Sequence, residues 1–136
     1  NHFFAQLGLP GLFHGYHGIV MGVSAGSMNA AHIVYAAPEE PGEAADPHYS
    51  RWMNGLGLTE TRILPHYQFI RDHVLDGQKV EDIALADSKK RHFLALPDGS
   101  YILCADGSEA LYGKGWYFAD GMMEEINEDE DVLPLR

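Results

Sequence analysis

Basic residues are scarce in this sequence. Nine lysines and arginines stand against 20 aspartates and glutamates, which gives a formal net charge of −11. Nucleic-acid binding needs clustered basic side chains, and the one basic cluster, residues 89–91, is explained by a solvated turn. We therefore expect no nucleic-acid partner. The acidic run at 124–131 is interpreted as a solubilising end.

Cysteine and long apolar runs are also nearly absent. Cys104 is the single cysteine, so it cannot form an intrachain disulfide, and this usage fits a reducing cytoplasm. Its apolar neighbours in 101–105 predict a small buried side chain. No apolar run approaches the roughly 18 residues of a membrane span, and we find no signal-peptide pattern. We predict a cytoplasmic protein with no membrane partner.

Patterns for metals and nucleotides are missing as well. The sequence has no H-E-x-x-H, no paired cysteines and no pair of histidines at helical spacing with an acidic partner. It also has no G-x-G-x-x-G and no phosphate-binding loop. We therefore predict neither a metal site nor a cofactor.

The composition that remains is that of a globular domain. Hydrophobic residues make up 46% and charged residues 21% of the 136 positions, which is enough for one modest core. Residues 1–136 are interpreted as a single domain. Periodicity and turn signals predict, in order, a helix at 3–7, a strand at 18–22, a helix at 28–34, a loop at 38–47, a strand within 56–64, a partly helical stretch at 76–87, and strands at 93–96, 101–105, 111–112 and 116–118.

The order of these elements predicts an α/β fold. Residues 18–22 are apolar on both faces, which is typical of a buried strand in a parallel sheet covered by helices. The later strands are separated by the turn signals at 97–100, 106–107 and 120–121. We expect a mainly parallel sheet followed by a C-terminal β meander.

A G-x-S-x-G pentapeptide follows the first predicted strand. In this setting a serine projects from a sharp strand-to-helix turn, and Gly22 and Gly26 leave room for the strained backbone. Ser24 is the predicted nucleophile. The N–H of Ala25, at the start of the following helix, is the predicted oxyanion donor. The alternative is that Ser24 merely caps the helix.

A base and an orienting acid follow two later strands. His66 comes directly after Leu64-Pro65, and Asp98 comes directly after Leu96-Pro97. Because strand ends line one edge of an open α/β sheet, we expect Ser24, His66 and Asp98 to meet there as a catalytic triad. The alternatives are a loop histidine at 66 and a turn-forming aspartate at 98. His32 is excluded as the base because it would lie two helical turns beyond Ser24.

Four stretches of this sequence resemble peptidase E, the aspartyl dipeptidase family of serine peptidases. They are 18–29, 55–58, 64–67 and 94–100, within a similarity that runs from about 3 to 121. The resemblance implies a fold like the class I glutamine amidotransferases, with a three-layer sheet and a triad in the order serine, histidine, acid. Asp98 stands where the founding dipeptidases have glutamate. Cyanophycinase is a more distant relative with a similar elbow.

The resemblance also implies a segment that this sequence lacks. Family members carry N-terminal strands and a glycine-rich loop that supplies the second oxyanion donor, so we interpret this chain as the C-terminal portion of such a domain. Loss of one oxyanion donor costs roughly 100- to 1000-fold in rate. We expect weak or no activity from the chain by itself, and either a need for the missing segment or self-association through an exposed sheet edge.

The sequence therefore predicts a serine peptidase that hydrolyses short peptides, dipeptidase-like, with Asp-X dipeptides as the substrates of the founding enzyme. One alternative is an esterase of the α/β-hydrolase type. That fold places the acid before the histidine, so His92 would be the base. The other alternative is a non-catalytic fragment or binding domain.

Overall fold

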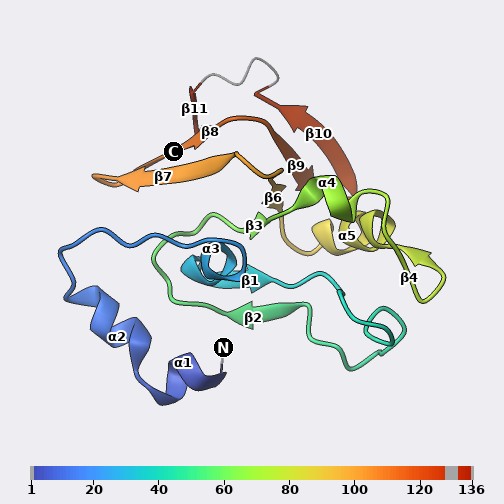
Figure 1. The fold of residues 1–136 in the computed structure, drawn as a ribbon, viewed down its shortest axis with the longest axis horizontal. Helices are drawn as coiled ribbons and strands as arrows, with labels where there is room; N and C mark the ends of the chain where they lie inside the picture. Colours follow the sequence, from blue (N-terminus) through green and yellow to red (C-terminus); the bar gives the residue numbers. More distant parts are fainter. Residues whose placement is uncertain (1, 128–131, 136) are drawn as a thin grey trace.

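The computed structural model describes residues 2–127 and 132–135 (Figure 1). Five helices are present in the described residues, and α5 is the longest of them. Their bounds are α1 His2–Gln6, α2 Leu9–His14, α3 Ala25–Ala30, α4 Tyr67–Ile70 and α5 Val80–Ser88. The helices predicted at 3–7 and within 76–87 correspond to α1 and α5.

Most strands are short and belong to four separate sheets. Their bounds are β1 Ile33–Tyr35, β2 Trp52–Asn54, β3 Ile63–Leu64, β4 Val74–Leu75, β5 Gln78–Lys79, β6 Phe93–Ala95, β7 Tyr101–Ala105, β8 Ser108–Tyr112, β9 Gly115–Ala119, β10 Met122–Ile126 and β11 Val132–Pro134. The acidic run predicted as a solubilising end is partly in β10, and its residues 128–131 lie outside the described residues.

The largest sheet has the order β10-β9-β6-β3. β3 runs parallel to β6, with Ile63 opposite Leu94, whereas β9 meets β6 antiparallel. The α/β class is therefore confirmed. The mainly parallel sheet is not found, because β3–β6 is the one parallel strand pair in the described part of the chain and β9 returns to β6 in the opposite direction.

The predicted C-terminal hairpins are confirmed, but they belong to two sheets. Asp106-Gly107 joins β7 to β8, and Asp120-Gly121 joins β9 to β10. All four turn residues have positive φ, which suits the Asp-Gly turns that match the twist of a hairpin. Four of the five residues of β7, an edge strand of the sheet β11-β8-β7, are exposed, and Cys104 is one of them, so its predicted burial was wrong.

Two local predictions around the nucleophile were wrong. Residues 18–22 form no strand, and Ile19 and Met21 are 93% and 85% exposed. A strand requires a hydrogen-bonded neighbour, and none of the described strands pairs with this segment. The helix predicted at 28–34 ends at Ala30, because β1 turns away to pair with β2.

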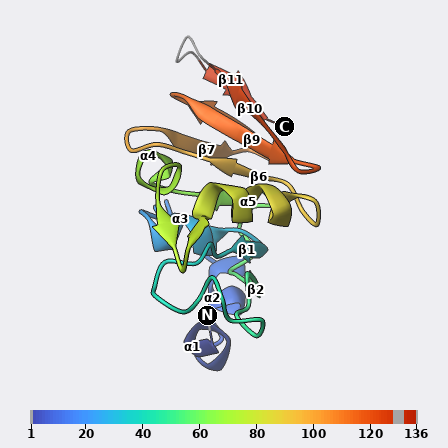
Figure 2. The same cartoon turned by 90° about the vertical axis from the view of Figure 1, so that its right-hand side faces the viewer.

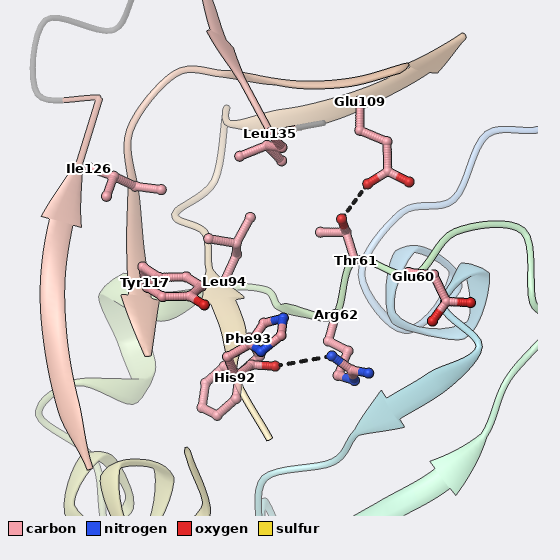
Figure 3. Close-up of a pocket in the computed structure, with 10 residues that line it drawn as sticks. All are labelled: Glu60, Thr61, Arg62, His92, Phe93, Leu94, Glu109, Tyr117, Ile126 and Leu135. Carbon is pink, nitrogen blue, oxygen red and sulfur yellow. Dashed lines mark hydrogen bonds between the residues drawn. The ribbon is translucent and has the colours of Figure 1, made fainter. Parts of the chain in front are cut away.

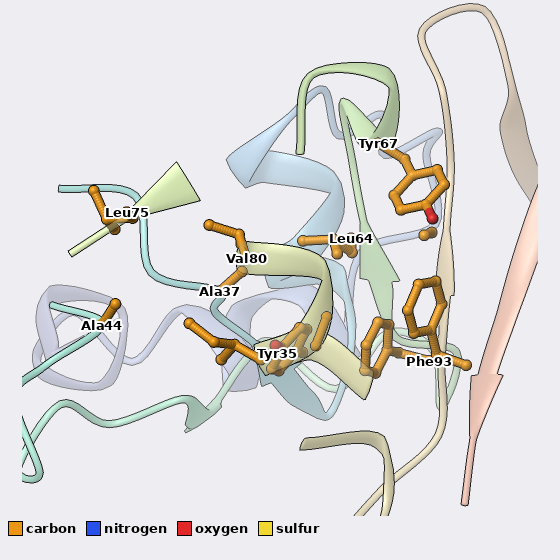
Figure 4. Close-up of a cluster of buried hydrophobic side chains, with 12 residues drawn as sticks. Tyr35, Ala37, Ala44, Leu64, Tyr67, Leu75, Val80 and Phe93 are labelled. Carbon is orange, nitrogen blue, oxygen red and sulfur yellow. The ribbon is translucent and has the colours of Figure 1, made fainter. Parts of the chain in front are cut away.

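The core lies between α5 and the largest sheet (Figure 4). Tyr35, Tyr67, Phe93 and Phe118 are essentially buried, and Phe93 stacks between Tyr35 at 4.3 Å and Phe118 at 5.0 Å between ring centroids. Figure 2 shows the elements ranged along one axis, from α1 at one end to β10 and β11 at the other. This packing fixes β3 and β6, the strands that precede His66 and Asp98.

Candidate active site

Ser24 lies at the sharp turn between segment 18–22, which has no regular secondary structure, and α3. Its backbone has φ 51° and ψ −121°, a conformation that L-residues rarely adopt. Its carbonyl accepts hydrogen bonds from the Ser27 hydroxyl at 2.6 Å and from the Ser27 and Met28 amides at 2.9 and 3.2 Å. Its own hydroxyl makes no capping hydrogen bond. The capping alternative is therefore not what the structure contains.

The two glycines beside Ser24 differ in their surroundings. A Cβ at Gly22 would lie 2.6 Å from the carbonyl carbon and oxygen of Gly26 and 2.7 Å from the Ser27 nitrogen, so only glycine fits there. A Cβ at Gly26 would meet nothing within 4 Å. Of the two glycines, only Gly22 is at a position where a larger residue would clash with this turn.

His66 reaches Ser24 from the end of β3. Its Nε2 lies 2.9 Å from the Ser24 Oγ. The residue has φ 59° and stands at the N-cap of α4, where its carbonyl accepts the Phe69 amide at 2.9 Å. The left-handed backbone at His66 turns the chain out of β3 and directs the ring back across the strand end.

Asp98 meets the other nitrogen of the same ring. Its Oδ1 lies 2.5 Å from the His66 Nδ1. Because an ionised carboxylate only accepts hydrogen bonds, Nδ1 carries the proton, and Nε2 is left to accept from the Ser24 hydroxyl. The parallel pairing of β3 with β6 brings both strand ends to one edge, as the sequence predicts for these two residues.

The assembled group is open to solvent. The side chains of His66 and Asp98 are 43% and 58% exposed. Ala25 occupies the first position of α3, where the backbone N–H groups of a helix have no partner within it. Its oxyanion role stays a prediction. The site is thus accessible to a substrate from outside, with the nucleophile at its partly buried end.

Two residues that sequence reasoning missed support this group. The Ser27 hydroxyl holds the Ser24 carbonyl, and the Gln68 side chain accepts the Asp98 amide at 3.1 Å. Ser27 could have been found by its spacing of three from the nucleophile, which is typical of the first turn of a helix. Gln68 gives no such signal, because its partner lies 30 residues away in the sequence.

Tyr67 anchors α4 directly behind His66. Its side chain is 1% exposed and its hydroxyl donates to a carboxylate oxygen of Glu81 on α5. Burial, followed by the neighbouring Glu81 carboxylate, raises the pKa of this phenol well above its usual range. Tyr67 therefore stays protonated and acts as a structural donor. It ties the helix behind the base to the core.

His92, the base of the esterase alternative, lies elsewhere. It precedes β6, whereas Asp98 follows that strand, and its ring packs against Tyr117 with centroids 5.7 Å apart. Its carbonyl accepts from the Arg62 guanidinium at 3.4 Å. The structure brings His66, and not His92, to Ser24.

A cavity of about 310 Å³ lies at the opposite ends of β3 and β6 (Figure 3). Its lining residues are Glu60, Thr61, Arg62, His92, Phe93, Leu94, Glu109, Tyr117, Ile126 and Leu135. Glu109, 4% exposed, accepts hydrogen bonds from the Thr59 hydroxyl at 2.6 Å and from the Thr61 hydroxyl. This cavity does not include Ser24, His66 or Asp98. The candidate site is therefore identified by its hydrogen bonds and not by a cavity.

Metal-binding groups and membrane-spanning helices are both absent from the residues that the structure describes. Within 2–127 and 132–135 no three His, Cys, Asp or Glu side chains gather in a way that could hold a metal ion. In the same ranges no helix has the length and apolarity to cross a membrane.

Comparison with known proteins connects this geometry to one family. The family model described as peptidase family S51 matches residues 16–111. The matched range contains Ser24, His66 and Asp98. Comparisons with curated proteins and with solved structures returned no match.

Proposed function

The chain belongs to peptidase family S51 and is a serine-type peptidase, and from this premise we propose that it hydrolyses short peptides through a triad of Ser24, His66 and Asp98. The observation that carries the proposal is the continuous chain of contacts from Ser24 Oγ to His66 Nε2 at 2.9 Å and from His66 Nδ1 to Asp98 Oδ1 at 2.5 Å. A serine needs an adjacent base to act as a nucleophile near neutral pH, and a base needs a group that orients it.

The proposed reaction has two halves. Ser24 Oγ attacks the scissile carbonyl carbon while His66 Nε2 takes the hydroxyl proton, and the same nitrogen then gives that proton to the departing amine. Water next attacks the acyl-serine, His66 again takes and returns a proton, and the carboxylic acid leaves. Asp98 holds the ring with Nδ1 protonated and stabilises the imidazolium that forms twice in each cycle.

The oxyanion of each tetrahedral intermediate requires hydrogen-bond donors. The Ala25 N–H is our candidate, because it follows the nucleophile at the start of α3. In the family that the sequence resembles, a glycine-rich loop supplies a second donor.

The substrate class comes from the resemblance to peptidase E. Dipeptides, with Asp-X as the first to test, are the proposed substrates, and the half-exposed His66 and Asp98 leave Ser24 reachable for such small molecules. The reducing compartment that suits a single cysteine supports a cytoplasmic location.

The test is hydrolysis of a panel of dipeptides, followed by amine release. Wild type is compared with Ser24→Ala, and Asp-X substrates with Ala-X and Lys-X substrates of the same second residue. Turnover that Ser24→Ala abolishes supports the peptidase. Equal turnover in both proteins would show that Ser24 does not carry the reaction, and a folded wild type with no turnover would favour the non-catalytic alternative.

A further inference from the structure

Asp98 occupies an exposed turn that must nevertheless hold one oxygen in a fixed place. Its side chain is 58% exposed, so water competes for the carboxylate. The turn has an internal hydrogen bond from the Ser100 amide to the Pro97 carbonyl at 3.2 Å, which sets its shape but not its position over His66. The position needs a contact from outside the turn.

That contact comes from Gln68. Its Oε1 accepts the backbone N–H of Asp98 at 3.1 Å. A backbone N–H can only donate, so the atom of the Gln68 amide that faces Asp98 is the oxygen. Gln68 lies on α4, two residues after His66, and so joins the two segments that carry the base and the acid.

The hydrogen bond from the Asp98 amide to Gln68 lies just beyond the last hydrogen bonds that the end of β6 makes with its neighbours. The Leu96 amide donates to the Leu64 carbonyl at 2.9 Å, and the Tyr67 amide donates to the Leu96 carbonyl at 3.1 Å. The next residue, Pro97, has no N–H to donate. The Asp98 amide is therefore the first donor beyond the sheet, and Gln68 accepts it.

We propose that Gln68 is a positioning residue that holds Asp98 against the His66 ring, an inference that rests on the proposed triad. The contacts form a closed loop: the His66 ring to the Asp98 carboxylate, the Asp98 amide to the Gln68 side chain, and the backbone of α4 back to His66. Without Gln68 the Asp98 amide bonds to water, and the carboxylate is free to shift along the ring edge.

The test uses the rate at which a fluorophosphonate labels Ser24. Gln68→Ala removes the acceptor, Gln68→Glu keeps an acceptor of the same length, and Gln78→Ala is the matched control, because the Gln78 amide bonds a carbonyl in the loop at Ala44. Circular dichroism and thermal unfolding establish that each variant is folded.

We expect Gln68→Ala to lower the maximal labelling rate about 10- to 100-fold, because misplacement by about 1 Å can cost that much. The probe concentration that gives half-maximal rate is expected to stay the same, since Gln68 acts through Asp98 and does not touch the probe. Gln68→Glu restores most of the rate, and Gln78→Ala keeps all of it. A folded Gln68→Ala protein that labels at the wild-type rate overturns the proposal.

A second readout does not depend on catalysis. The proton on His66 Nδ1 gives an NMR resonance that a close carboxylate shifts downfield, and His66→Ala assigns it. If wild type is not labelled, the proposed function fails, and this resonance still tests Gln68. A downfield resonance that is present in wild type and lost in Gln68→Ala supports the positioning role. An unchanged resonance in Gln68→Ala contradicts it.

Discussion

Ser24 directs its partly buried hydroxyl toward His66 from a strained backbone. A non-glycine residue at φ 51° and ψ −121° costs of order 1–3 kcal/mol. The Ser27 hydroxyl and two amides of α3 offset part of this cost through the Ser24 carbonyl. The strained turn at Ser24 is also what brings Gly22 close to the first turn of the helix.

The two glycines of the elbow are expected to respond in opposite ways to alanine. Gly22→Ala places a methyl group 2.6 Å from the Gly26 backbone. We therefore expect the free energy of unfolding to fall by about 2 kcal/mol, as in other overpacked sites, and labelling at Ser24 to be lost. Gly26→Ala meets open space inside α3 and is expected to be neutral or to stabilise by up to about 1 kcal/mol.

Urea unfolding and phosphonate labelling of both variants check this pair. Equal stability of Gly22→Ala and wild type would mean that the turn is not packed as described. A strong loss in Gly26→Ala would point to a neighbour of α3 that the described residues do not include.

Among the elements, α5 is tied to β1 and to Arg51, the residue before β2, by a buried polar group. Asp87 accepts a hydrogen bond from the Tyr35 hydroxyl at 3.1 Å and pairs with the Arg51 Nε at 3.0 Å. Burial raises the pKa of the Asp87 carboxyl, and Arg51 opposes that shift. Burial also raises the pKa of Tyr35 well above its usual range, so the phenol stays a donor.

Arg51→Met is expected to cost about 3 kcal/mol of stability near pH 7, because it leaves the Asp87 carboxylate buried without its cation. The pKa of Asp87 is raised in the folded state, so the folded protein binds more protons than the unfolded one, and the contribution of Asp87 to stability falls as pH rises from about 4. The variant should therefore be closest to wild type at acid pH.

Urea unfolding at several pH values measures this difference. Arg51→Met combined with Asp87→Leu removes both charges and is expected to recover most of the loss. A destabilisation by Arg51→Met that is the same at every pH would contradict the role given to Asp87.

Elements set by local chemistry could be predicted from the sequence. The Asp-Gly turns define the hairpins at 106–107 and 120–121 within a few residues, and β3, β6 and α5 lie where apolar patterns place them. The strand at 18–22 could not be predicted correctly, because pattern alone does not say whether a neighbouring strand is there to pair with it.

The candidate site likewise has residues that local sequence predicts and residues that only long-range contacts reveal. His66 and Asp98 follow the parallel strands β3 and β6, so a rule about sheet edges was enough to group these two residues. Ser24 was grouped with them through a strand predicted at 18–22, and the structure brings its hydroxyl to His66 without that strand. Gln68 was missed because a side-chain contact across 30 residues leaves no periodic trace. Gly26 was given a steric role that only the three-dimensional surroundings could assess.

At the scale of the whole molecule, the segment before the nucleophile exposes several large apolar side chains. Tyr16, Ile19, Met21 and Val23 are between 55% and 93% exposed. Exposed apolar side chains that gather on one surface are typical of an interaction site or an association hazard. Self-association was expected through an exposed sheet edge, but residues 16–23 form no strand, so we predict that it uses these exposed apolar side chains instead.

Ile19→Lys with Met21→Lys is expected to shift the chain toward the monomer in sedimentation velocity, because it places two charges on this surface. Val74→Lys is the matched control, since Val74 is 57% exposed on β4, away from the segment. The same sedimentation behaviour in all three proteins would exclude 16–23 as the association surface.

The central claim concerns Ser24, and intact-mass analysis after fluorophosphonate treatment tests it most directly. Wild type, Ser24→Ala and His66→Ala are treated in parallel, with folding checked by circular dichroism. We predict that wild type gains the mass of one phosphonyl group, that Ser24→Ala gains none, and that His66→Ala reacts far more slowly because its nucleophile has no base. Labelling of Ser24→Ala, or a folded wild type that gains no mass, would contradict the account.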